Sequence, residues 1–200
     1  MSNFIGVECI RCKRPLGNNL IFDGCPHCQA EGYNVNFKTK YDYAELAAKM
    51  EANKLHFEGK GVWKYKQLLP VKDETSPVTL DEGETPLRHL KKLGEKLGLS
   101  NLYVKDESRN PTWSYKDRLC SVAVTKAVED GAEVINVSST GNHGAAAAAY
   151  AAAAGIPCVV FTIPDVPETM KVLMQSYGAY VLATPTPKDR WKLMRECVKE

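Results

Sequence analysis

The sequence predicts an α/β protein whose main part is a parallel sheet covered by helices, preceded by a small cysteine-rich module. Three observations support this fold class. Strand-like and helix-like segments alternate from about residue 100 onwards, which is the order of elements in a parallel α/β sheet. Four cysteines lie close together near the N-terminus. A polar, glycine-bearing motif at Ser138–Asn142 follows one strand, and ligands of such sheets bind at the carboxyl ends of strands.

Residues 1–40 are predicted to form a zinc ribbon. Two Cys-x2-Cys pairs, with twelve residues between them, supply four candidate metal ligands: Cys9, Cys12, Cys25 and Cys28. Four thiolates satisfy tetrahedral zinc, and because such a site has no open position, the predicted role of the metal is structural. The spacing between the pairs is slightly shorter than in the usual ribbon. Disulfide bonds are the main alternative, and His27 is expected to be a solvated neighbour of the site.

Residues 41–78 are predicted to form a helix and then an extended arm. The helix is expected from Asp42 to about Asn53, and four apolar residues share one of its faces: Tyr43, Leu46, Ala47 and Met50. Glycine and proline residues then break regular structure between residues 54 and 78: Gly59, Gly61, Pro70 and Pro77.

Residues 79–200 are predicted to hold the parallel sheet. Strands are expected at 101–106, 134–138, 157–163 and 179–183. Helices are expected at 115–130, 142–154 and 167–176, and from about Lys188. For the first of these helices, Ser114 is a favourable N-cap, Asp117 stands where a capping-box acid would lie, and Gly131 is a stop signal. The alanine-rich run 145–154 strongly favours the second helix.

Lys116 is the candidate for a reactive amine. It lies in the first turn of the helix predicted at 115–130, which is the wrong end of the helix dipole for a cation. The dipole and any desolvation both disfavour the charged ammonium, and a neutral lysine amine forms Schiff bases with carbonyl cofactors. Taken alone, however, the residue reads as an ordinary exposed lysine, which is the commoner case.

The segment from Val134 to Gly144 is a candidate anion site. Residues 134–138 are expected to be a short β-branched strand, and Gly141-Asn142-His143-Gly144 opens the alanine-rich helix. A strand, a glycine-bearing turn and a helix N-terminus together direct backbone N–H groups toward a ligand. The same residue types are common in simple turns between a strand and a helix, so this alternative stays open.

Four motifs, taken together, resemble the fold type II (tryptophan synthase β-like) pyridoxal-phosphate enzymes. They are Glu-Gly-Glu-Thr-Pro-Leu at 82–87, Leu-Tyr-Val-Lys-Asp-Glu at 102–107, Asn-Pro-Thr-Trp-Ser-Tyr-Lys-Asp-Arg at 110–118 and Ser-Ser-Thr-Gly-Asn-His-Gly at 138–144. The resemblance covers about residues 78–200, and within the group the motifs are most similar to the threonine synthases. It implies the parallel three-layer sheet of fold type II, and many threonine synthase-like proteins also carry a zinc ribbon in front.

The resemblance implies a role for each matching residue. Lys116 would hold pyridoxal 5'-phosphate covalently and then move protons at the substrate carbons. Asn142 would hydrogen-bond the ring hydroxyl oxygen of the cofactor. The substrate α-carboxylate would bind to main-chain N–H groups of a loop made of Ser139, Thr140, Gly141 and His143. Three further residues would lie near the substrate: Thr85, Lys105 and Ser114.

Two positions depart from the family pattern. The family usually has Gly where this chain has Trp113, and often Phe where it has Tyr115. An indole so near Lys116 would fill space that a bulky or phosphorylated substrate needs, which puts O-phosphohomoserine, the threonine synthase substrate, in doubt. Alternatively, Trp113 faces the core or a subunit interface. The family's late glycine-rich loop for the cofactor phosphate has no match here, so the sequence reads as the N-terminal part of an enzyme.

The predicted function is that of a pyridoxal-phosphate-dependent lyase of amino-acid metabolism that resembles threonine synthase. Its chemistry would be elimination and replacement at the β or γ carbon of an activated small amino acid. A serine or threonine dehydratase and a cysteine-synthase-like β-replacement enzyme are close alternatives. Outside the enzymes, the alternative is a zinc-ribbon scaffold with an incomplete cofactor domain. The resemblance also suggests a homodimer.

Composition narrows the remaining classes of protein. Of 200 residues, 44% are hydrophobic and 25% are charged, which is ordinary for a globular protein. The net charge is +2, and without a dense basic-aromatic stripe no nucleic-acid partner is expected. Apolar runs fall short of the roughly 20 residues of a membrane span, and no signal peptide is recognised, so the expected compartment is the cytoplasm. Three further cysteines are expected to be small core hydrophobes: Cys120, Cys158 and Cys197.

Overall fold

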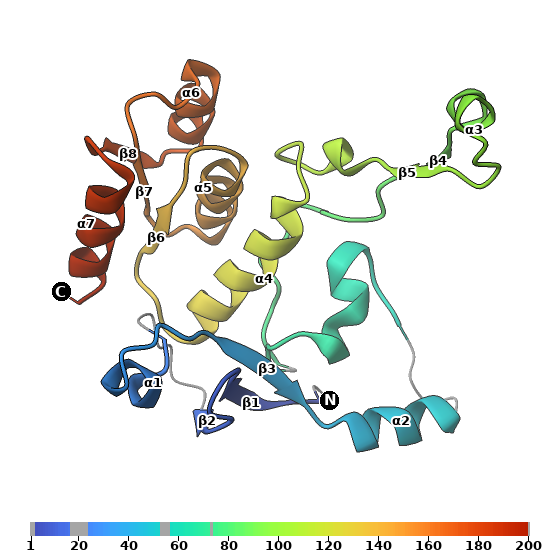
Figure 1. The fold of residues 1–200 in the computed structure, drawn as a ribbon, viewed down its shortest axis with the longest axis horizontal. Helices are drawn as coiled ribbons and strands as arrows, with labels where there is room; N and C mark the ends of the chain where they lie inside the picture. Colours follow the sequence, from blue (N-terminus) through green and yellow to red (C-terminus); the bar gives the residue numbers. More distant parts are fainter. Residues whose placement is uncertain (1–2, 17–23, 53–56, 73, 200) are drawn as a thin grey trace. The chain divides into compact units, whose positions relative to one another are not determined.

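A computed structural model of the chain describes residues 3–16, 24–52, 57–72 and 74–199. The chain divides into two compact units, one made of Met1–Gly59 with Lys64–Thr75 and the other of Lys60–Trp63 with Ser76–Glu200. In Figure 1 the first unit is coloured mainly blue to cyan, and the second runs mainly from green to red.

The first unit is built on a small antiparallel sheet. Its strands are β1 (Phe4–Cys9), β2 (Pro15–Leu16) and β3 (Phe37–Tyr41), in the order β2-β1-β3. The short helix α1 (Pro26–Ala30) begins with a proline, which is favourable there because the first N–H groups of a helix have no partner within it. The first cysteine pair begins with Cys9 at the end of β1, and the second consists of Cys25, the N-cap of α1, and Cys28 within α1.

Helix α2 (Tyr43–Glu51) confirms the helix predicted after residue 41. Asp42 is its N-cap, and the Asp42 carboxylate accepts a hydrogen bond from the Glu45 N–H at 2.9 Å. This bond satisfies one of the free donors of the first turn. The predicted end of the helix at Asn53 lies outside the described residues.

The apolar face predicted for α2 is not buried as a face. Leu46 is buried, but Tyr43 and Met50 are exposed by 69% and 65%, and Ala47 is exposed too. Periodicity predicts an apolar stripe on the helix without showing whether another element covers it.

The arm predicted to be extended contains 3-10 turns, η1 (Gly61–Leu68). The prediction fails because a long-range anchor orders the start of this segment. The Trp63 indole is buried, and its Nε1 donates to the Ser121 hydroxyl at 2.7 Å. The Ser121 hydroxyl donates in turn to the Val78 carbonyl at 2.8 Å. Glycine and proline residues indicate only the local preference of the backbone. The contacts of Trp63 and Ser121 override that preference.

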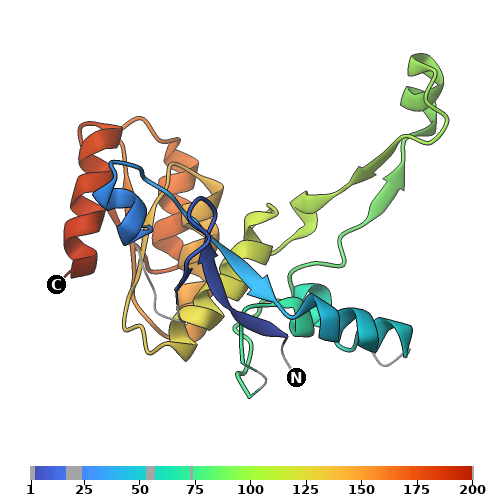
Figure 2. The same cartoon turned by 60° about the horizontal axis from the view of Figure 1, so that its bottom comes forward.

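The second unit holds a parallel sheet of three strands, β6 (Ile135–Ser138), β7 (Cys158–Thr162) and β8 (Tyr180–Ala183), in that order. Its long helices are α4 (Lys116–Glu129), α5 (Asn142–Ala154), α6 (Glu168–Ser176) and α7 (Pro187–Lys199). Helices α5 and α6 pack on one face of the sheet and α7 packs on the other (Figures 1 and 2). The predicted α/β fold with a three-layer parallel sheet is confirmed.

Helix α5 forms the centre of the core of this unit. Every residue from Gly144 to Ala151 is buried, as expected for a helix that is apolar on all sides. Because most of these side chains are only methyl groups, α4, α6 and the sheet pack closely around α5. Its neighbours in the core include Val124, Val137, Val160 and Met174.

The three cysteines expected in the core behave differently. Cys120 and Cys158 are buried, and burial raises the pKa of each thiol to about 12, so these two are small core hydrophobes as predicted. Cys197 is exposed, and for this residue the prediction is wrong. Helix α7 covers the sheet with another face, on which Met194 is buried.

The strand predicted at 101–106 is present as β5 (Tyr103–Lys105), but it lies outside the parallel sheet. It pairs antiparallel with β4 (Leu87–His89), and α3 (Lys91–Leu97) lies between the two strands in sequence. Every residue of both strands is exposed. The predicted place in the sheet is wrong because β-propensity indicates a strand without indicating its partner. The short turn η2 (Glu107–Arg109) follows β5.

Among the residues that the structure describes, none of the helices is both long and apolar enough to cross a membrane. The most apolar of the long helices, α5, has 13 residues, whereas a span needs about 20.

Candidate functional site

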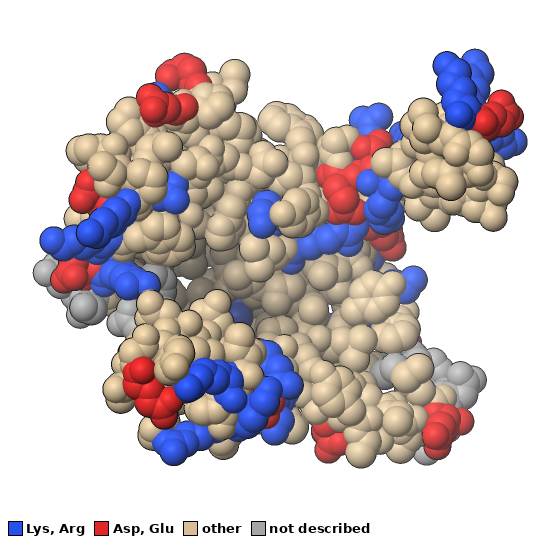
Figure 3. All heavy atoms as spheres, viewed as in Figure 1, with Lys and Arg blue, Asp and Glu red and all other residues tan. Residues whose placement is uncertain are grey.

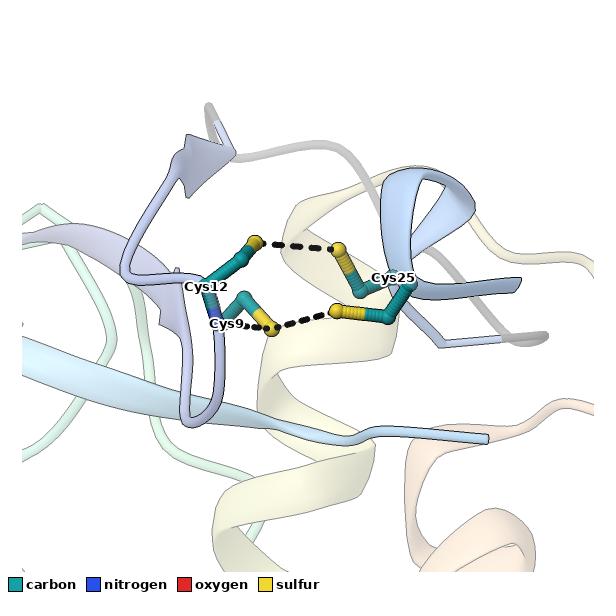
Figure 4. A group of neighbouring side chains, drawn as sticks. Cys9, Cys12 and Cys25 are labelled. Carbon is teal, nitrogen blue, oxygen red and sulfur yellow. Dashed lines mark hydrogen bonds between the residues drawn. The ribbon is translucent and has the colours of Figure 1, made fainter. Parts of the chain in front are cut away.

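The four cysteines of the first unit converge on one point (Figure 4). Their sulfur atoms all lie within 4.8 Å of one another, with Cys9 Sγ 3.6 Å from Cys28 Sγ and Cys12 Sγ 3.7 Å from Cys25 Sγ. Tetrahedral zinc with Zn–S bonds of about 2.3 Å requires sulfurs about 3.8 Å apart. The cysteines are free thiols, so the structure contradicts the disulfide alternative, and the donor set fits a closed zinc site.

Hydrogen bonds favour the charged form of Cys9 that metal binding requires, whereas burial raises the pKa of Cys28 to about 11. The Cys12 N–H donates to Cys9 Sγ at 3.4 Å, and Arg11 Nη1 lies 3.8 Å from Cys28 Sγ. Burial opposes ionisation of Cys9, but backbone N–H groups of Cys12 and Arg11 leave its pKa lowered to about 6. His27 is exposed and contacts Arg14, which agrees with its prediction as a solvated neighbour.

Lys116 is the first residue of α4, one residue later than the helix start expected after Ser114. Tyr115 is the N-cap, while the Ser114 hydroxyl accepts a hydrogen bond from the Lys116 N–H at 3.2 Å. Ser114 is buried, Lys116 is half-buried, and the lysine Nζ lies 4.6 Å from the centroid of the Tyr115 ring. The amine therefore stands at the N-terminus of the helix, as the sequence predicts.

The Asp117 carboxylate accepts a hydrogen bond from the Ser114 backbone, as predicted for a capping acid, and it also binds Thr112. It is fully buried, and its two carboxylate oxygens accept hydrogen bonds from the Thr112 N–H at 3.1 and 3.2 Å and from the Thr112 hydroxyl at 2.9 and 3.0 Å. Burial raises the pKa of Asp117, and the hydrogen bonds from Thr112 oppose that shift. Asp117 therefore ties the loop before the helix back onto the helix.

Residues 110–115, called the lysine loop below, are held at their start by Asn110. The Asn110 Oδ1 accepts from the Gly83 N–H at 2.9 Å, and its Nδ2 donates to the Glu107 carbonyl and carboxylate, each at 2.9 Å. Between Asn110 and the helix, Trp113 has a φ of 62° and is 65% exposed. The structure thus places Trp113 in solvent within this chain, and the alternative in which it faces the core of the chain is wrong.

Glu107 joins the lysine helix to the Thr-Pro-Leu motif. Arg118 Nε donates to Glu107 Oε2 at 2.8 Å and Arg118 Nη2 to Oε1 at 2.9 Å, and the Thr85 hydroxyl donates to Oε1 at 2.7 Å. The Arg118 hydrogen bonds, opposed by burial, leave the pKa of Glu107 lowered to about 2. Lys105 Nζ donates to the Thr85 carbonyl. The Thr85 and Lys105 side chains therefore bind other parts of the protein, and a substrate contact by either residue stays a prediction.

Glu82 anchors the start of the same motif to α5. The fully buried Glu82 carboxylate accepts hydrogen bonds from the Tyr150 hydroxyl at 2.7 Å and from the Thr79 hydroxyl and the Leu80 N–H at 3.1 Å each. Burial, and then the bond to Glu82, raises the pKa of Tyr150. Tyr150 lies on the helix that the Ser138–Gly144 motif opens, so the first and last motifs are joined.

The Ser138–Gly144 loop begins α5 as the sequence predicts. The buried Ser139 hydroxyl accepts hydrogen bonds from the Gly144 N–H at 2.8 Å and the Gly141 N–H at 3.2 Å. Thr140 and Asn142 are exposed. Ser138 Oγ is buried and has no hydrogen-bond partner among the described residues. The loop is therefore ordered by Ser139 and still offers polar groups at the carboxyl end of β6.

Lys116 and this loop are brought together in space. His143 is half-buried, and burial, followed by the nearby positive charge of Lys116, lowers the pKa of its imidazole. Cys120 Sγ also lies 3.9 Å from the His143 carbonyl, which packs the start of α4 against the start of α5. A lysine amine beside a helix N-terminus is the arrangement expected of a site for a carbonyl-bearing, anionic ligand.

Several residues that organise the site escape sequence reasoning. Gly144 is one: a Cβ there would lie 2.7 Å from Met174 Sδ, 3.0 Å from Val160 Cγ1 and 3.2 Å from Ser139 Cβ. The other residues work through buried polar contacts: Glu82, Glu107, Asn110 and Arg118. The one signal in the sequence that could have identified these residues is that they lie within the four motifs.

A cavity of about 590 Å³ lies beside the lysine loop. Thr112 and Trp113 of the loop, Asn142 at the start of α5, and Met170 and Leu173 of α6 contribute to its walls. Its volume is within the range of small-molecule sites. The structure therefore places a predicted cofactor-binding residue, Asn142, at a cavity that the lysine loop also lines.

Comparison with known proteins adds a family match. Residues 78–200 match the family model described as "Pyridoxal-phosphate dependent enzyme". The chain is 46% identical to threonine synthase of Methanocaldococcus jannaschii over 178 residues, covering 88% of this chain and 42% of that protein. It is 44% identical to threonine synthase of Methanosarcina acetivorans, covering 77% and 36%. The chain thus spans less than half the length of these relatives.

Two solved structures are similar in fold to more than half of the chain. A pyridoxal 5'-phosphate-dependent aspartate racemase has a TM-score of 0.53 and 29% identity, covering 57% of this chain and 37% of its own. A mutant of O-ureido-L-serine synthase with O-ureido-L-serine bound has a TM-score of 0.53 and 28% identity, covering 58% and 38%. These similarities agree with the parallel α/β fold described above.

Proposed function

The chain belongs to the pyridoxal-phosphate dependent enzymes, and we propose that it carries the lysine-bearing part of a threonine synthase-like lyase. The observation that carries the proposal is the approach of Lys116, at the start of α4, to the Ser138–Gly144 loop at the start of α5. The identity to threonine synthases over most of the chain supports the choice within the family.

The residues present fit pyridoxal phosphate in three respects. Lys116 offers an amine at a helix N-terminus, Asn142 offers an exposed amide at the neighbouring cavity, and Ser138 Oγ is a buried polar atom without a partner among the described residues. Lys116 would hold the cofactor and Asn142 would bind its ring hydroxyl. When bound, pyridoxal phosphate supplies an electron sink for negative charge that develops at substrate carbons.

The chain's own groups would then position the substrate and move its protons. The N–H groups at the start of α5, within Ser139, Thr140, Gly141 and His143, would bind the substrate α-carboxylate, because a helix N-terminus favours an anion. The Lys116 amine would accept and return protons at the substrate carbons. Asp117 and Asn110 hold the lysine loop from both sides, which keeps the amine in place between steps.

The substrate class is a small amino acid with a leaving group at its β or γ carbon, and the reaction is elimination with or without replacement. O-phosphohomoserine is the first candidate from the threonine synthase relatives. Serine or threonine dehydration and β-replacement are the alternatives, and the similarity to an enzyme solved with O-ureido-L-serine favours keeping β-replacement. The complete protein would act as a homodimer in the cytoplasm.

The first unit would supply a structural zinc ribbon. In this proposal residues 1–40 form the ribbon around Cys9, Cys12, Cys25 and Cys28, residues 41–78 connect it, and residues 79–200 form the lysine-bearing part. Four thiolates close the metal site, so zinc would stabilise the fold and take no part in the reaction.

Visible absorption tests the proposal against a zinc-ribbon scaffold without a cofactor site. The chain is titrated with pyridoxal phosphate, and a new band that borohydride removes is expected because a lysine–carbonyl adduct is reducible. The band should be absent in Lys116→Ala, while circular dichroism shows that this variant stays folded. A band of equal strength in Lys116→Ala, or no band in the wild-type chain at saturating cofactor, would reject the lyase proposal.

A further inference from the structure

Trp113 holds an unusual conformation at the wall of the 590 Å³ cavity. Its φ of 62° lies in the left-handed region, which bulky residues rarely adopt and which is retained when the surroundings impose it. The hydrogen bonds of Thr112 to Asp117 and of Asn110 to Gly83 impose it here, from either side. The indole is 65% exposed, so packing inside the chain does not explain its position.

Helix α6 also contributes apolar residues to the lining of this cavity. Met170 and Leu173 line the cavity, and both are partly buried against the core. Asn142 lines the same cavity, so the cavity continues directly from the site proposed for the cofactor. A ligand held there would therefore contact both Trp113 and α6.

The described residues that line the cavity include no cationic side chain that would bind an anionic group. Of the residues that line it, Glu168 is the one that carries a charge, and it forms an ion pair with Lys171 at 3.3 Å. In Figure 3 the surface over α6 is largely uncharged, with acidic side chains near its upper end. A phosphate group requires cationic or multiple N–H donors, whereas an indole and aliphatic side chains favour an uncharged group.

We propose that this cavity binds the uncharged, apolar side chain of an amino-acid ligand, and that Trp113 selects this class against phosphorylated amino acids. The proposal rests on the proposed function for the identity of the ligand as an amino acid. It narrows the substrate class to amino acids whose leaving group at the β or γ carbon is uncharged, because O-phosphohomoserine would have to place its phosphate group outside this cavity. Trp113 is thereby a specificity-determining residue.

Methyl resonances of the methionines provide a direct test on the whole 200-residue chain without cofactor. With 13C-labelled methionine methyl groups, Met170 reports on the cavity, and Met50, exposed in the first unit, serves as an internal control. The chain is titrated with L-norleucine and, separately, with O-phosphohomoserine at the same concentrations. We expect L-norleucine to shift the Met170 signal saturably and O-phosphohomoserine to leave it unchanged. An equal shift by both, or no shift by L-norleucine, would overturn the proposal.

The variant Trp113→Gly removes the indole without adding backbone strain, because glycine adopts a positive φ freely. We expect it to weaken L-norleucine binding about tenfold or more, which is the scale on which apolar pocket contacts discriminate. Trp191→Ala is the matched control, since Trp191 is an exposed indole on α7 outside the cavity, and it should bind L-norleucine as the wild type does. Equal losses in the two variants, or no loss in Trp113→Gly, would contradict the inference.

This test separates failure of the specificity proposal from failure of the proposed function. Borohydride reduction with pyridoxal phosphate reads attachment at Lys116, and Trp113→Gly leaves both Lys116 and Asn142 in place. Trp113→Gly could keep the cofactor attachment and also bind L-norleucine as the wild type does. This result would reject the role of Trp113 and leave the cofactor proposal standing. Absence of attachment in the wild type would reject the cofactor proposal, while a saturable shift of Met170 would still identify the cavity as an apolar ligand site.

Discussion

Arg118 and Glu107 form a two-point ion pair, with Arg118 Nε 2.8 Å from Glu107 Oε2 and Nη2 2.9 Å from Oε1. Both side chains are largely buried, being 30% and 26% exposed. The planar guanidinium and carboxylate fix each other's orientation through the two bonds. Because Arg118 stands two residues after Lys116, the pair ties the first turn of α4, with its amine, to the segment after β5.

Replacing Glu107 by Gln should destabilise the protein by about 1–2 kcal/mol at neutral pH, because charge-assisted hydrogen bonds are lost and partial exposure reduces their worth. The pKa of Glu107 is lowered to about 2 from a usual value of 4.5. The folded state of the wild type therefore gains this stabilisation fully above pH 4.5 and loses it as the pH falls through about 2. Urea unfolding at several pH values measures the difference between wild type and variant.

The difference should shrink as the pH falls below 4.5, and a difference that is constant with pH would contradict the role of this ion pair. Glu45→Gln is the matched control. Its ion pair with Lys49 is a surface pair within one helix, 2.8 Å long, in which Glu45 is 51% exposed. Such pairs contribute less than about 0.5 kcal/mol, so the control should change stability little at any pH.

Gly61→Ala should be more destabilising than Gly131→Ala, although both glycines have a positive φ, 57° and 80°. A Cβ on Gly61 would lie 1.9 Å from the Glu82 carbonyl oxygen, whereas one on Gly131 meets nothing within 4 Å. Gly131→Ala bears only the conformational cost of about 1 kcal/mol, and Gly61→Ala adds a steric cost for a total of about 3 kcal/mol. Chemical denaturation measures both; equal losses would show that the two backbone segments do not cross closely.

The titration of His143 should report its distance from Lys116. Burial, and then the positive charge of Lys116, lower the His143 pKa below its usual 6.5. In Lys116→Met the His143 midpoint, followed by NMR of the ring C–H groups, should rise but stay below 6.5, because burial is the larger cause. The control Lys126→Met, in which the removed lysine pairs with Glu129 and Asp130, should leave it unchanged. An unchanged midpoint in Lys116→Met would place the amine away from the loop.

The lowered pKa of His143 also makes the free energy of unfolding depend on pH. Below pH 6.5 the unfolded chain binds a proton at His143 that the folded chain refuses, so the free energy of unfolding falls as the pH falls through this range. Above pH 6.5 the imidazole is neutral in both states and contributes no pH dependence. Lys116→Met should therefore make the acid-side decline shallower, which thermal unfolding between pH 5 and 7 would detect.

Zinc should bind stoichiometrically to the first unit. We expect about one zinc per chain, since four cysteine sulfurs satisfy one ion, and Cys12→Ser should lower both the metal content and the stability of the unit. Cys197→Ser, which changes an exposed cysteine outside the cluster, is the control and should keep the metal. Metal analysis after chelation and reloading measures the zinc content of the wild type and of both variants. A wild-type chain without zinc, or a Cys12→Ser chain with full zinc, would reject the ribbon.

Local patterns predict the parts of the fold whose determinants are local. The three parallel strands and helices α4 to α7 follow from β-branched runs, apolar periodicity and the alanine-rich segment, and each is present near its predicted bounds. The cysteine cluster is also predictable, because metal-ligand spacing is itself a short-range pattern. The start of α4 differs by one residue, since Ser114 bonds the Lys116 N–H from a position one residue outside the cap.

Contacts between distant residues are beyond the reach of such patterns. Tyr150 binds Glu82 across 68 positions, and Trp63 binds Ser121 across 58, and no periodicity encodes such pairs. Asp117 illustrates the same point within the site: its spacing predicts the bond from the Ser114 backbone, but not its burial or its hydrogen bonds from Thr112. For the same reason the sequence predicts β5 in the parallel sheet, whereas its partner is β4.

The position of the reduced cofactor label tests most directly whether Lys116 is the reactive amine. The chain is incubated with pyridoxal phosphate, reduced with borohydride and digested, and the modified peptide is identified by mass spectrometry. We predict one predominant label, on Lys116, that is lost in Lys116→Arg, with Lys105→Arg as the control that keeps it. Label that is spread over exposed lysines, or concentrated on a lysine other than Lys116, would contradict the role proposed for Lys116.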